Sequence, residues 1–305
     1  MVRADALHGD QLNPATDGVD GILASTLFVT DLDFTLLRAD ATLSAFTVET
    51  INDLISHGLQ FTYATARSHG SAHRATRALR LELPVITYGG TMTVDPRSGT
   101  PSAVRTVPAA VVDGILRETE RAGGLAPLLH TYRDGTDRIA WRADRVTDGV
   151  RHFVEPRRGD ARLTPVQRWS DDDLSGAYYV SLIGARDEVT ALHARLADRI
   201  AGCAAILSED PYAPGVHWLE IHSALGSKGV AAAALAADLG LERIVAFGDN
   251  HADIALFEAA DTGYAVDNAV PELQRVATAL IGHHETDAVA RWLDARFPRG
   301  AFTPR

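Results

Sequence analysis

The sequence contains almost no lysine or cysteine. Lys228 is the only lysine in 305 residues, and the other 28 members of the Lys and Arg set are arginines. Cys203 is the only cysteine, so the chain cannot form an internal disulfide. Cys203 also lies in an apolar stretch, which is typical of a buried structural thiol. A reducing, cytoplasmic location is therefore expected.

Long apolar runs and basic clusters are missing as well. No stretch approaches the ~18 apolar residues that indicate a membrane span, and Met1 to Ser25 lack the basic start and apolar run of a signal peptide. The net charge is −11, which argues against nucleic acid or an anionic membrane as a partner. A divalent cation fits this charge better. The sequence does not indicate an oligomeric state.

What the chain does contain is an ordinary globular composition, with 46% hydrophobic and 23% charged residues. Its length suits two domains, at about 150 residues for each. Residues 1–24 are rich in Asp, Gly, Asn and Pro, and we expect a flexible N-terminal extension there. Alternating strands and helices predict a doubly wound, Rossmann-like α/β core with a parallel sheet, made of residues 25–105 and 213–298. Residues 106–212 are expected to form a smaller α+β domain inserted into the core. Core strands are predicted at 26–30, 59–64, 84–88, 216–221, 243–247 and 263–266.

Polar residues follow several of these strands. Asp31 and Asp33 come directly after the first strand, Thr65 after the second, and Asp249 and Asp253 after an apolar strand near the C-terminus. Ligands of α/β sheets bind at the carboxyl ends of the strands, so we expect these side chains to meet there. Lys228 starts an Ala-rich helical run, and a helix start is a common place for an anion.

Together these residue types are suited to phosphoryl transfer. An aspartate can attack phosphorus and form an aspartyl phosphate, and a second carboxylate can protonate the leaving group. Magnesium prefers oxygen ligands and keeps several waters, so a few carboxylates are enough to hold it. A single lysine in a chain that otherwise uses arginine indicates a position where a compact ammonium lies against a crowded anion, because a wide guanidinium is not equivalent there. The alternative explanation is a codon bias that left one lysine by chance.

The chain resembles the haloacid dehalogenase superfamily of aspartate-dependent phosphatases, and in particular its type IIB, Cof-like members with a large α/β cap. Four stretches carry the resemblance in order: Asp31-Leu32-Asp33-Phe34-Thr35-Leu36-Leu37, Ala64-Thr65-Ala66-Arg67, Ser227-Lys228-Gly229 and Gly248-Asp249-Asn250-His251-Ala252-Asp253. Residues 266–272 also look like the stretch that follows in Cof-like proteins.

The resemblance implies a role for each of these residues. Asp31 would be the nucleophile and a metal ligand, and Asp33 the general acid/base with its carbonyl on the metal. Phosphate binding would fall to Thr65, Lys228 and Asn250. Asp249 would ligate the metal, and Asp253 would be a ligand or a hydrogen-bond acceptor behind the ligands. The implied metal is Mg²⁺.

The expected activity is hydrolysis of a small phosphorylated metabolite, a sugar phosphate or a nucleotide-like compound, through an aspartyl-phosphate intermediate. Two alternatives remain at this point: a sugar phosphomutase of the same superfamily, and a non-catalytic binding protein on this fold. The pattern does not identify the substrate, because specificity lies in loops of the inserted domain.

Some residues depart from the family pattern or have several interpretations. Phe34 stands where the family usually has a small residue, and it forms either an apolar wall beside the leaving group or part of the core. Arg67 either faces the phosphoryl pocket or pairs with a carboxylate. His69 and His73 have a spacing that suits a soft metal, but a pocket rim or surface role is favoured. Candidates for substrate contact in or near the inserted domain are Tyr132, Arg133, Trp141, Arg142, Tyr178, Tyr179, Trp218 and Glu220.

Overall fold

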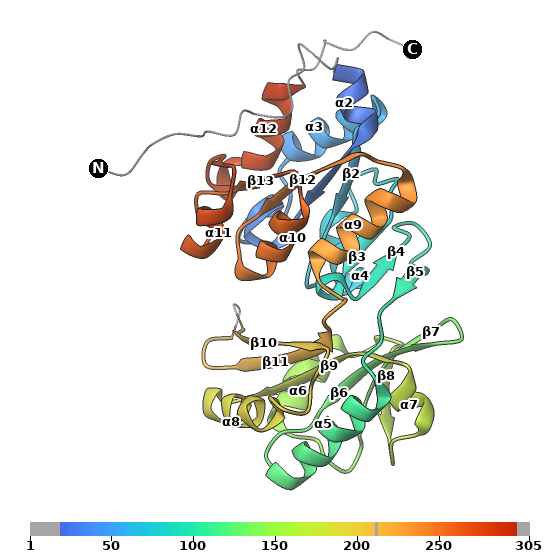
Figure 1. The fold of residues 1–305 in the computed structure, drawn as a ribbon. Coiled ribbons are helices and arrows are strands. Elements are labelled where there is room, and N and C mark those ends of the chain that lie inside the picture. Colours follow the sequence, from blue (N-terminus) through green and yellow to red (C-terminus); the bar gives the residue numbers. More distant parts are fainter. Residues whose placement is uncertain (1–18, 211–212, 298–305) are drawn as a thin grey trace. The chain divides into compact units, whose positions relative to one another are not determined.

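The computed structural model describes residues 19–210 and 213–297 and forms two compact units (Figure 1). One unit, the core, takes the described residues up to Ser102 and from Ser227 onward, and the other, the cap, spans Ala103–Gly226. The second boundary lies later than the expected residue 213. The strand predicted at 216–221 is β11 (His217–Ser223), and it pairs with cap strands rather than returning to the core. The alternation of apolar residues identified this strand but not the strands it pairs with, because a strand shows the same alternation whichever sheet it joins.

The N-terminal expectation was also wrong in part. Residues 1–18 lie outside the described residues, but Val19–Ser25 form the helix α2. Ile22 and Leu23 of this helix are fully buried. About two turns of helix carry too little periodicity to be recognised from sequence.

The core sheet is parallel throughout, in the order β14-β13-β12-β1-β2. The third predicted strand, at 84–88, joins it by only one parallel bridge between Ala64 and Ile86. It belongs mainly to a separate three-stranded sheet, β3-β4-β5. The strands are β1 (Thr26–Thr30), β2 (Gln60–Tyr63), β3 (Val85–Thr87), β4 (Met92–Val94), β5 (Pro101–Val104), β12 (Arg243–Gly248), β13 (Thr262–Ala265) and β14 (Ala279–Leu280).

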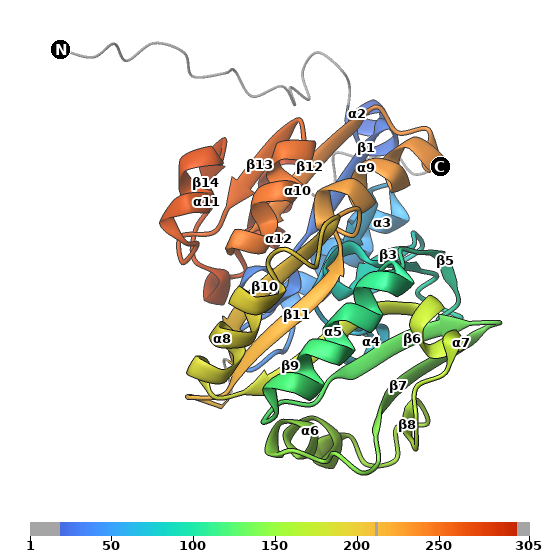
Figure 2. The ribbon, with the colours of Figure 1, turned by 60° about the horizontal axis from the view of Figure 1, so that its bottom comes forward.

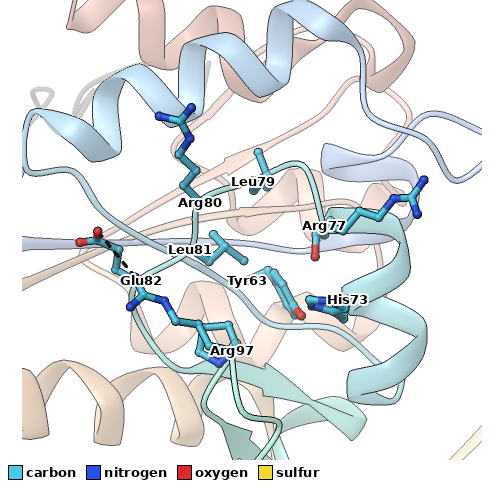
Figure 3. Close-up of a pocket in the computed structure, with 10 residues that line it drawn as sticks. Tyr63, His73, Arg77, Leu79, Arg80, Leu81, Glu82 and Arg97 are labelled. Carbon is cyan, nitrogen blue, oxygen red and sulfur yellow. Dashed lines mark ion pairs between the residues drawn. The ribbon is translucent and has the colours of Figure 1, made fainter.

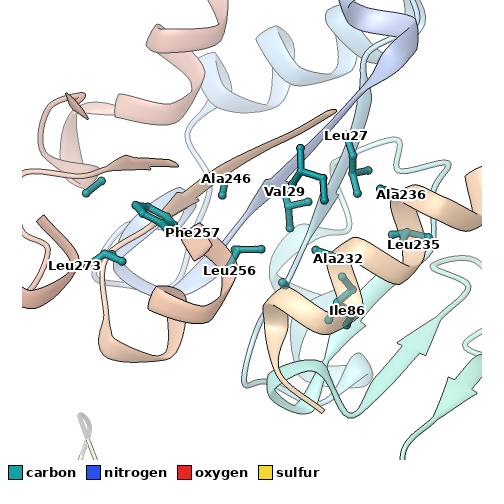
Figure 4. Close-up of a cluster of buried hydrophobic side chains, with 14 of the residues drawn as sticks. Leu27, Val29, Ile86, Ala232, Leu235, Ala236, Ala246, Leu256, Phe257 and Leu273 are labelled. Atoms are coloured by element: carbon teal, nitrogen blue, oxygen red, sulfur yellow. The ribbon is translucent and has the colours of Figure 1, made fainter. Parts of the chain in front are cut away.

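Helices cover both faces of the core sheet. Alternate residues of β1 point to opposite faces, so Leu27 and Val29 pack in a cluster with α9 and α10 (Figure 4), while Phe28 packs against Phe297 on the other side. On that second face Trp292 lies edge-on to Phe247 and at a tilt against Tyr264. The core helices are α3 (Ala45–Ser56), α4 (His69–Thr76), α9 (Lys228–Leu239), α10 (Ile254–Ala259), α11 (Pro271–Val276) and α12 (Ala288–Arg296). The doubly wound prediction is confirmed.

The cap is built on a mixed six-stranded sheet in the order β10-β11-β9-β6-β7-β8. Helices α5 and α8 lie side by side on one face (Figure 2), and α6 packs on the other through Val150 and Phe153. The remaining cap elements are β6 (Leu128–Arg133), β7 (Thr136–Arg142), β8 (Leu163–Val166), β9 (Ala177–Gly184), β10 (Cys203–Glu209), α5 (Ala109–Ala122), α6 (Asp148–Val154), α7 (Asp171–Ser175) and α8 (Arg186–Leu196). None of the helices among the described residues is long and apolar enough to span a bilayer.

One glycine lets the start of α9 approach the core. Gly90 has φ +108°, and a Cβ at this position would lie 2.2 Å from the carbonyl oxygen of Ser227 and 2.7 Å from the backbone nitrogen of Lys228. Both neighbours are backbone atoms, so a side-chain rotation cannot relieve the clash. The sequence Gly89-Gly90 therefore determines how closely Lys228 can sit against this turn.

We predict that Gly90→Ala destabilises the protein by about 2–4 kcal/mol, since it combines backbone strain with a backbone clash. The matched control is Gly58→Ala, where φ is +100° but no atom lies within 4 Å of the added Cβ. In that variant the free energy of unfolding should fall only by the cost of a positive φ for a residue with a Cβ, about 1–2 kcal/mol. Thermal and urea unfolding measure both; equal losses for the two variants would show that the contact with Ser227 is unimportant.

A buried histidine makes the cap sensitive to acid. His130 is 3% exposed, its Nε2 lies 3.2 Å from Ser181 Oγ, and its ring meets the edges of Phe153 and Tyr179. Burial lowers the pKa of His130 to about 3, with Arg162 and Arg157 adding to the effect. The folded cap therefore holds a neutral imidazole, whereas the unfolded chain protonates it near pH ~6.5.

The stabilisation from neutral His130 is present above the unfolded pKa and is lost as the pH falls from ~6.5 toward the folded value. We predict that His130→Gln, which keeps a polar partner for Ser181, weakens the pH dependence of unfolding in this range. The measurement is the thermal midpoint of both proteins between pH 7 and pH 4. Parallel curves for the two proteins would contradict the assignment.

Candidate active site

The end of β1 carries the first acidic residue into the centre of the core. The backbone N–H of Asp31 donates to the carbonyl of Phe247 at 2.9 Å, which continues the ladder with β12 for one more residue. The chain then leaves the sheet in a turn whose middle residue, Phe34, has φ 56°. Asp31 is 6% exposed, so its carboxylate lies in a largely enclosed place.

Lys228 is the first residue of α9, and Ser227 caps this helix by accepting from the N–H of Val230. The Lys228 side chain is buried with 4% exposure. Its Nζ donates to Asp31 Oδ1 and to Asp253 Oδ1, both at 2.6 Å. One ammonium thus joins a strand end to the turn after β12.

Asp253 is completely buried and has both of its oxygens occupied. Oδ1 accepts from Lys228, and Oδ2 accepts from the backbone N–H groups of Asp249 and Asn250, each at 3.0 Å. Gly248 makes this geometry possible, since a Cβ there would lie 2.6 Å from Cβ of Asp253. Asp253 therefore organises the loop that carries Asp249.

Three carboxylates gather beside the ammonium. Asp31, Asp249 and Asp253 each offer an oxygen, and these oxygens lie within 4.8 Å of one another, the one such cluster of three found in residues 19–210 and 213–297. Thr35 Oγ1 donates to Asp249 Oδ1 at 3.1 Å and orients it. Three negative groups facing one positive group favour a divalent cation, and an all-oxygen donor set suits Mg²⁺ or a similar hard ion. The residues present therefore fit a metal.

The pKa values reflect this crowding. Burial raises the pKa of Asp31 well above its usual range, and Asp253 and Asp249 raise it further, while Lys228 opposes them. Burial and the neighbouring Asp253 raise the pKa of Asp249 to about 6. Burial alone would lower the pKa of Lys228, but Asp253 and Asp31 outweigh it and the pKa is raised. The ammonium is therefore firmly charged.

Asp33 stands outside this buried group. Its side chain is 33% exposed, and Arg67 grips it with two parallel hydrogen bonds, from Nε to Oδ2 at 2.8 Å and from Nη2 to Oδ1. Of the two interpretations for Arg67, the structure shows the pairing with a carboxylate. A fork of this kind fixes the orientation of a carboxylate as well as its position.

The remaining predicted phosphate-binding residues are placed differently. Thr65 is buried after β2, and its Oγ1 accepts from the N–H of Arg67 at 3.2 Å. Asn250 is exposed, and its Oδ1 accepts from the N–H of His251 at 2.7 Å as the cap of the 3₁₀ turn η4 (His251–Asp253). The structure thus brings the side chains of Asp31, Lys228 and the two later aspartates together, whereas the side chain of Asn250 accepts from backbone N–H groups of its own turn.

His69 and His73 have ring centroids 5.7 Å apart, and His73 lines a separate pocket of about 390 Å³ on the core (Figure 3). Tyr63 and His73 lie beside each other there, while the guanidinium groups of Arg77 and Arg80 point away from the pair. The favoured rim interpretation of His73 agrees with this placement. None of the predicted catalytic, phosphate-binding or metal-binding residues lines this pocket.

Several cap candidates turn out to have structural partners. Tyr178 donates to Asp137 at 2.9 Å, and Trp218 donates to Asp210 at 3.1 Å. Arg142 pairs with Asp144 at 2.7 Å. Burial raises the pKa of Glu220 to about 7, and Tyr179 stacks on His222 with ring centroids 5.5 Å apart.

Comparison with known proteins identifies the family. The sequence profile of haloacid dehalogenase-like hydrolases matches residues 28–293. The chain belongs to this family. It is 26% identical over 279 residues to the 5-amino-6-(5-phospho-D-ribitylamino)uracil phosphatase of Bacillus subtilis, covering 89% of this chain and 97% of that protein. It is 25% identical to the pyridoxal phosphate phosphatase of Escherichia coli, covering 89% and 98%. The prediction of a phosphatase of this family is confirmed.

Solved structures support the same fold. A haloacid dehalogenase-like hydrolase from Bacteroides thetaiotaomicron superposes with a TM-score of 0.71 at 19% identity, covering 89% of this chain and 99% of that one. A sugar phosphatase of subclass IIB superposes with a TM-score of 0.65 at 15% identity, covering 88% and 98%. These likenesses show that the chain shares the fold of both structures.

Sequence reasoning missed two groups of residues around the site. Thr35 lies within the first motif, but nothing in its spacing indicated a bond to Asp249. Asn268 and His284 come from later loops, and they contact the turn after Asp31. A hydrogen bond between residues more than 200 positions apart leaves no local pattern, so a sequence signal for these contacts does not exist in a single chain.

Proposed function

We propose that this protein is a Mg²⁺-dependent phosphatase that hydrolyses a small phosphorylated metabolite through an aspartyl phosphate on Asp31. The observation that carries the proposal is the buried group of Asp31, Lys228, Asp249 and Asp253, in which one ammonium lies 2.6 Å from two carboxylates. A carboxylate that can act as nucleophile, the ammonium of Lys228 and a group of metal-binding oxygens then lie within one enclosed place. Phosphoryl transfer draws most of its rate from such fixed charges.

Each residue has a step in this proposal. An oxygen of Asp31 attacks phosphorus, the phosphoryl group moves to Asp31, and the leaving oxygen takes a proton from Asp33. Asp33 then accepts a proton from the water that hydrolyses the aspartyl phosphate. Lys228 and Thr65 hold phosphoryl oxygens. Asn250 would join them only if its side chain leaves its present capping bond.

Asp31 and Asp249, with the backbone carbonyl of Asp33, are the residues we propose for Mg²⁺. When bound, the ion supplies positive charge to the phosphoryl oxygens and offsets the repulsion between the carboxylates. Asp253 fits the acceptor role better than the ligand role, because both of its oxygens already accept hydrogen bonds from Lys228, Asp249 and Asn250. Its part is to orient Lys228 and the Asp249 loop.

The substrate class rests on the relatives. The two phosphatases compared above act, by their names, on a phosphorylated ribitylaminouracil and on pyridoxal phosphate, and a third relative is named for HMP-PP. A small phosphate ester that carries a heterocycle or a sugar is therefore the class we propose. This agrees with the sugar phosphate or nucleotide-like substrate expected from the sequence.

The test is phosphate release from a panel of sugar phosphates, nucleotides and vitamin phosphates, measured with Mg²⁺ and with EDTA. We expect turnover only with the metal. Asp31→Asn should abolish it while the thermal midpoint stays close to that of the wild type, because the amide keeps the shape of the carboxylate without its nucleophilic charge. Residual activity within about tenfold of wild type, a barrier change of only ~1.4 kcal/mol, would contradict the role of Asp31.

A second prediction concerns the single lysine. Lys228→Arg should lower kcat/KM almost as severely as Lys228→Ala, because a guanidinium fork is too wide to replace an ammonium held 2.6 Å from both Asp31 and Asp253. Steady-state kinetics and Mg²⁺ titrations of both variants measure this. An Arg variant that retains most of the activity would show that charge alone is required there.

A further inference from the structure

The turn that follows Asp31 holds a bulky residue in a strained conformation. Phe34 has φ 56° and ψ 15°, the left-handed region that glycine adopts freely and a large aromatic residue rarely adopts. Phe34 directly follows Asp33, so its backbone sets the direction in which the turn carries the Asp33 carboxylate. A residue keeps a strained conformation only where surrounding contacts hold it there. Strained residues of this kind cluster at functional sites.

Two side chains from later loops supply these contacts. Asn268 Nδ2 donates to the carbonyl of Phe34 at 2.8 Å, and the backbone N–H of His284 donates to Asn268 Oδ1 at 3.2 Å. The ring of His284 lies edge-on to the ring of Phe34, with centroids 5.6 Å apart. We call these two residues the Asn268–His284 strap.

The strap holds the far end of the turn as well. His284 Nδ1 lies 3.0 Å from the carbonyl oxygen of Leu37. A carbonyl only accepts, so Nδ1 carries the hydrogen and donates it. His284 is buried, and the strap therefore bonds the backbone at Phe34, in the middle of the turn, and at Leu37, where the turn ends.

We propose that Asn268 and His284 are positioning residues for Asp33. They keep the Phe34 turn in its strained form, which fixes the position of the Asp33 backbone. Arg67 fixes the carboxylate at the end of the Asp33 side chain. The inference rests on the proposed role of Asp33 as general acid and base. It predicts that loosening the strap impairs proton transfer to the leaving group rather than binding of the phosphoryl group.

The first experiment compares Asn268→Ala with a matched control, Asn52→Ala. Asn52 makes the same pair of bonds elsewhere in the core, donating to the carbonyl of Ala78 at 2.9 Å and accepting from the N–H of Arg80 at 2.7 Å. Kinetics are measured with an alkyl phosphate, whose leaving oxygen needs a proton, and with a nitrophenyl phosphate, whose leaving group does not.

For Asn268→Ala we expect kcat on the alkyl phosphate to fall by about tenfold to a hundredfold, with KM nearly unchanged and a much smaller loss on the nitrophenyl phosphate. Asn52→Ala should change the thermal midpoint but not the ratio of the two rates. Equal losses of Asn268→Ala on both substrates, or no loss on either, would overturn the inference.

The second experiment relieves the strain itself. Phe34→Gly lets the turn adopt the positive φ without steric cost, so the strap has less to hold. In the Phe34→Gly background the further loss of kcat caused by Asn268→Ala should shrink to about twofold. The two substitutions are coupled because both act on the backbone of the same turn. An undiminished loss would show that the strap does not act through Phe34. If Asn268→Ala does not fold, His284→Phe takes its place, since it keeps an aromatic edge but cannot donate to Leu37.

Asp33→Asn separates this inference from the proposed function. A loss that is larger on the alkyl phosphate than on the nitrophenyl phosphate supports Asp33 as the acid, because only the leaving-group step differs between the two substrates, and the strap variants are then judged against that difference. An Asp33→Asn enzyme as active as wild type overturns the role of Asp33 and the positioning inference together. A selectively impaired Asp33→Asn beside an unselective Asn268→Ala overturns the positioning inference alone.

Discussion

The core depends on one ammonium shared by two carboxylates. Lys228 lies 2.6 Å from both Asp31 and Asp253, and all three side chains are buried. Removing the lysine would leave two buried carboxylates without their counter-charge, and leaving a buried charge unpaired in this way typically costs about 3–5 kcal/mol. This buried ion pair therefore holds together the start of α9, the end of β1 and the loop after β12.

Small residues make this contact possible. Gly90 allows the backbone of Ser227 and Lys228 to approach the turn after β3, and Gly248 leaves room for Asp253 below Asp249. The same cluster is suited to a cation. Three carboxylates surround one ammonium, and burial raises the pKa values of Asp31 and Asp249. A divalent ion would relieve the repulsion that the fold imposes.

The two carboxylates of the proposed reaction, the nucleophile Asp31 and the general acid and base Asp33, are held in place in different ways. The nucleophile is enclosed and paired with a buried lysine, whereas Asp33 is partly exposed and gripped by Arg67. Directly after Asp33 comes the strained Phe34, in a turn that Asn268 and His284 hold through the backbone carbonyls of Phe34 and Leu37. Phe34 carries a large side chain at a positive φ, so this chain uses side-chain contacts at a position where glycine would need none.

The sequence by itself determined the alternation of strands and helices in the core, the family and the residues of the central cluster. Buried parallel strands are short apolar runs, and Asp31 and Asp249 follow such runs directly, so their common edge could be inferred. It did not determine that β11 belongs to the cap, since alternation does not name a partner strand. It left the role of Arg67 open and did not indicate the bonds from Thr35, Asn268 and His284, because contacts between distant segments exist only after the chain has folded. Motif residues were found because chemistry fixes their type and local spacing, whereas the residues that orient them are fixed only by tertiary packing.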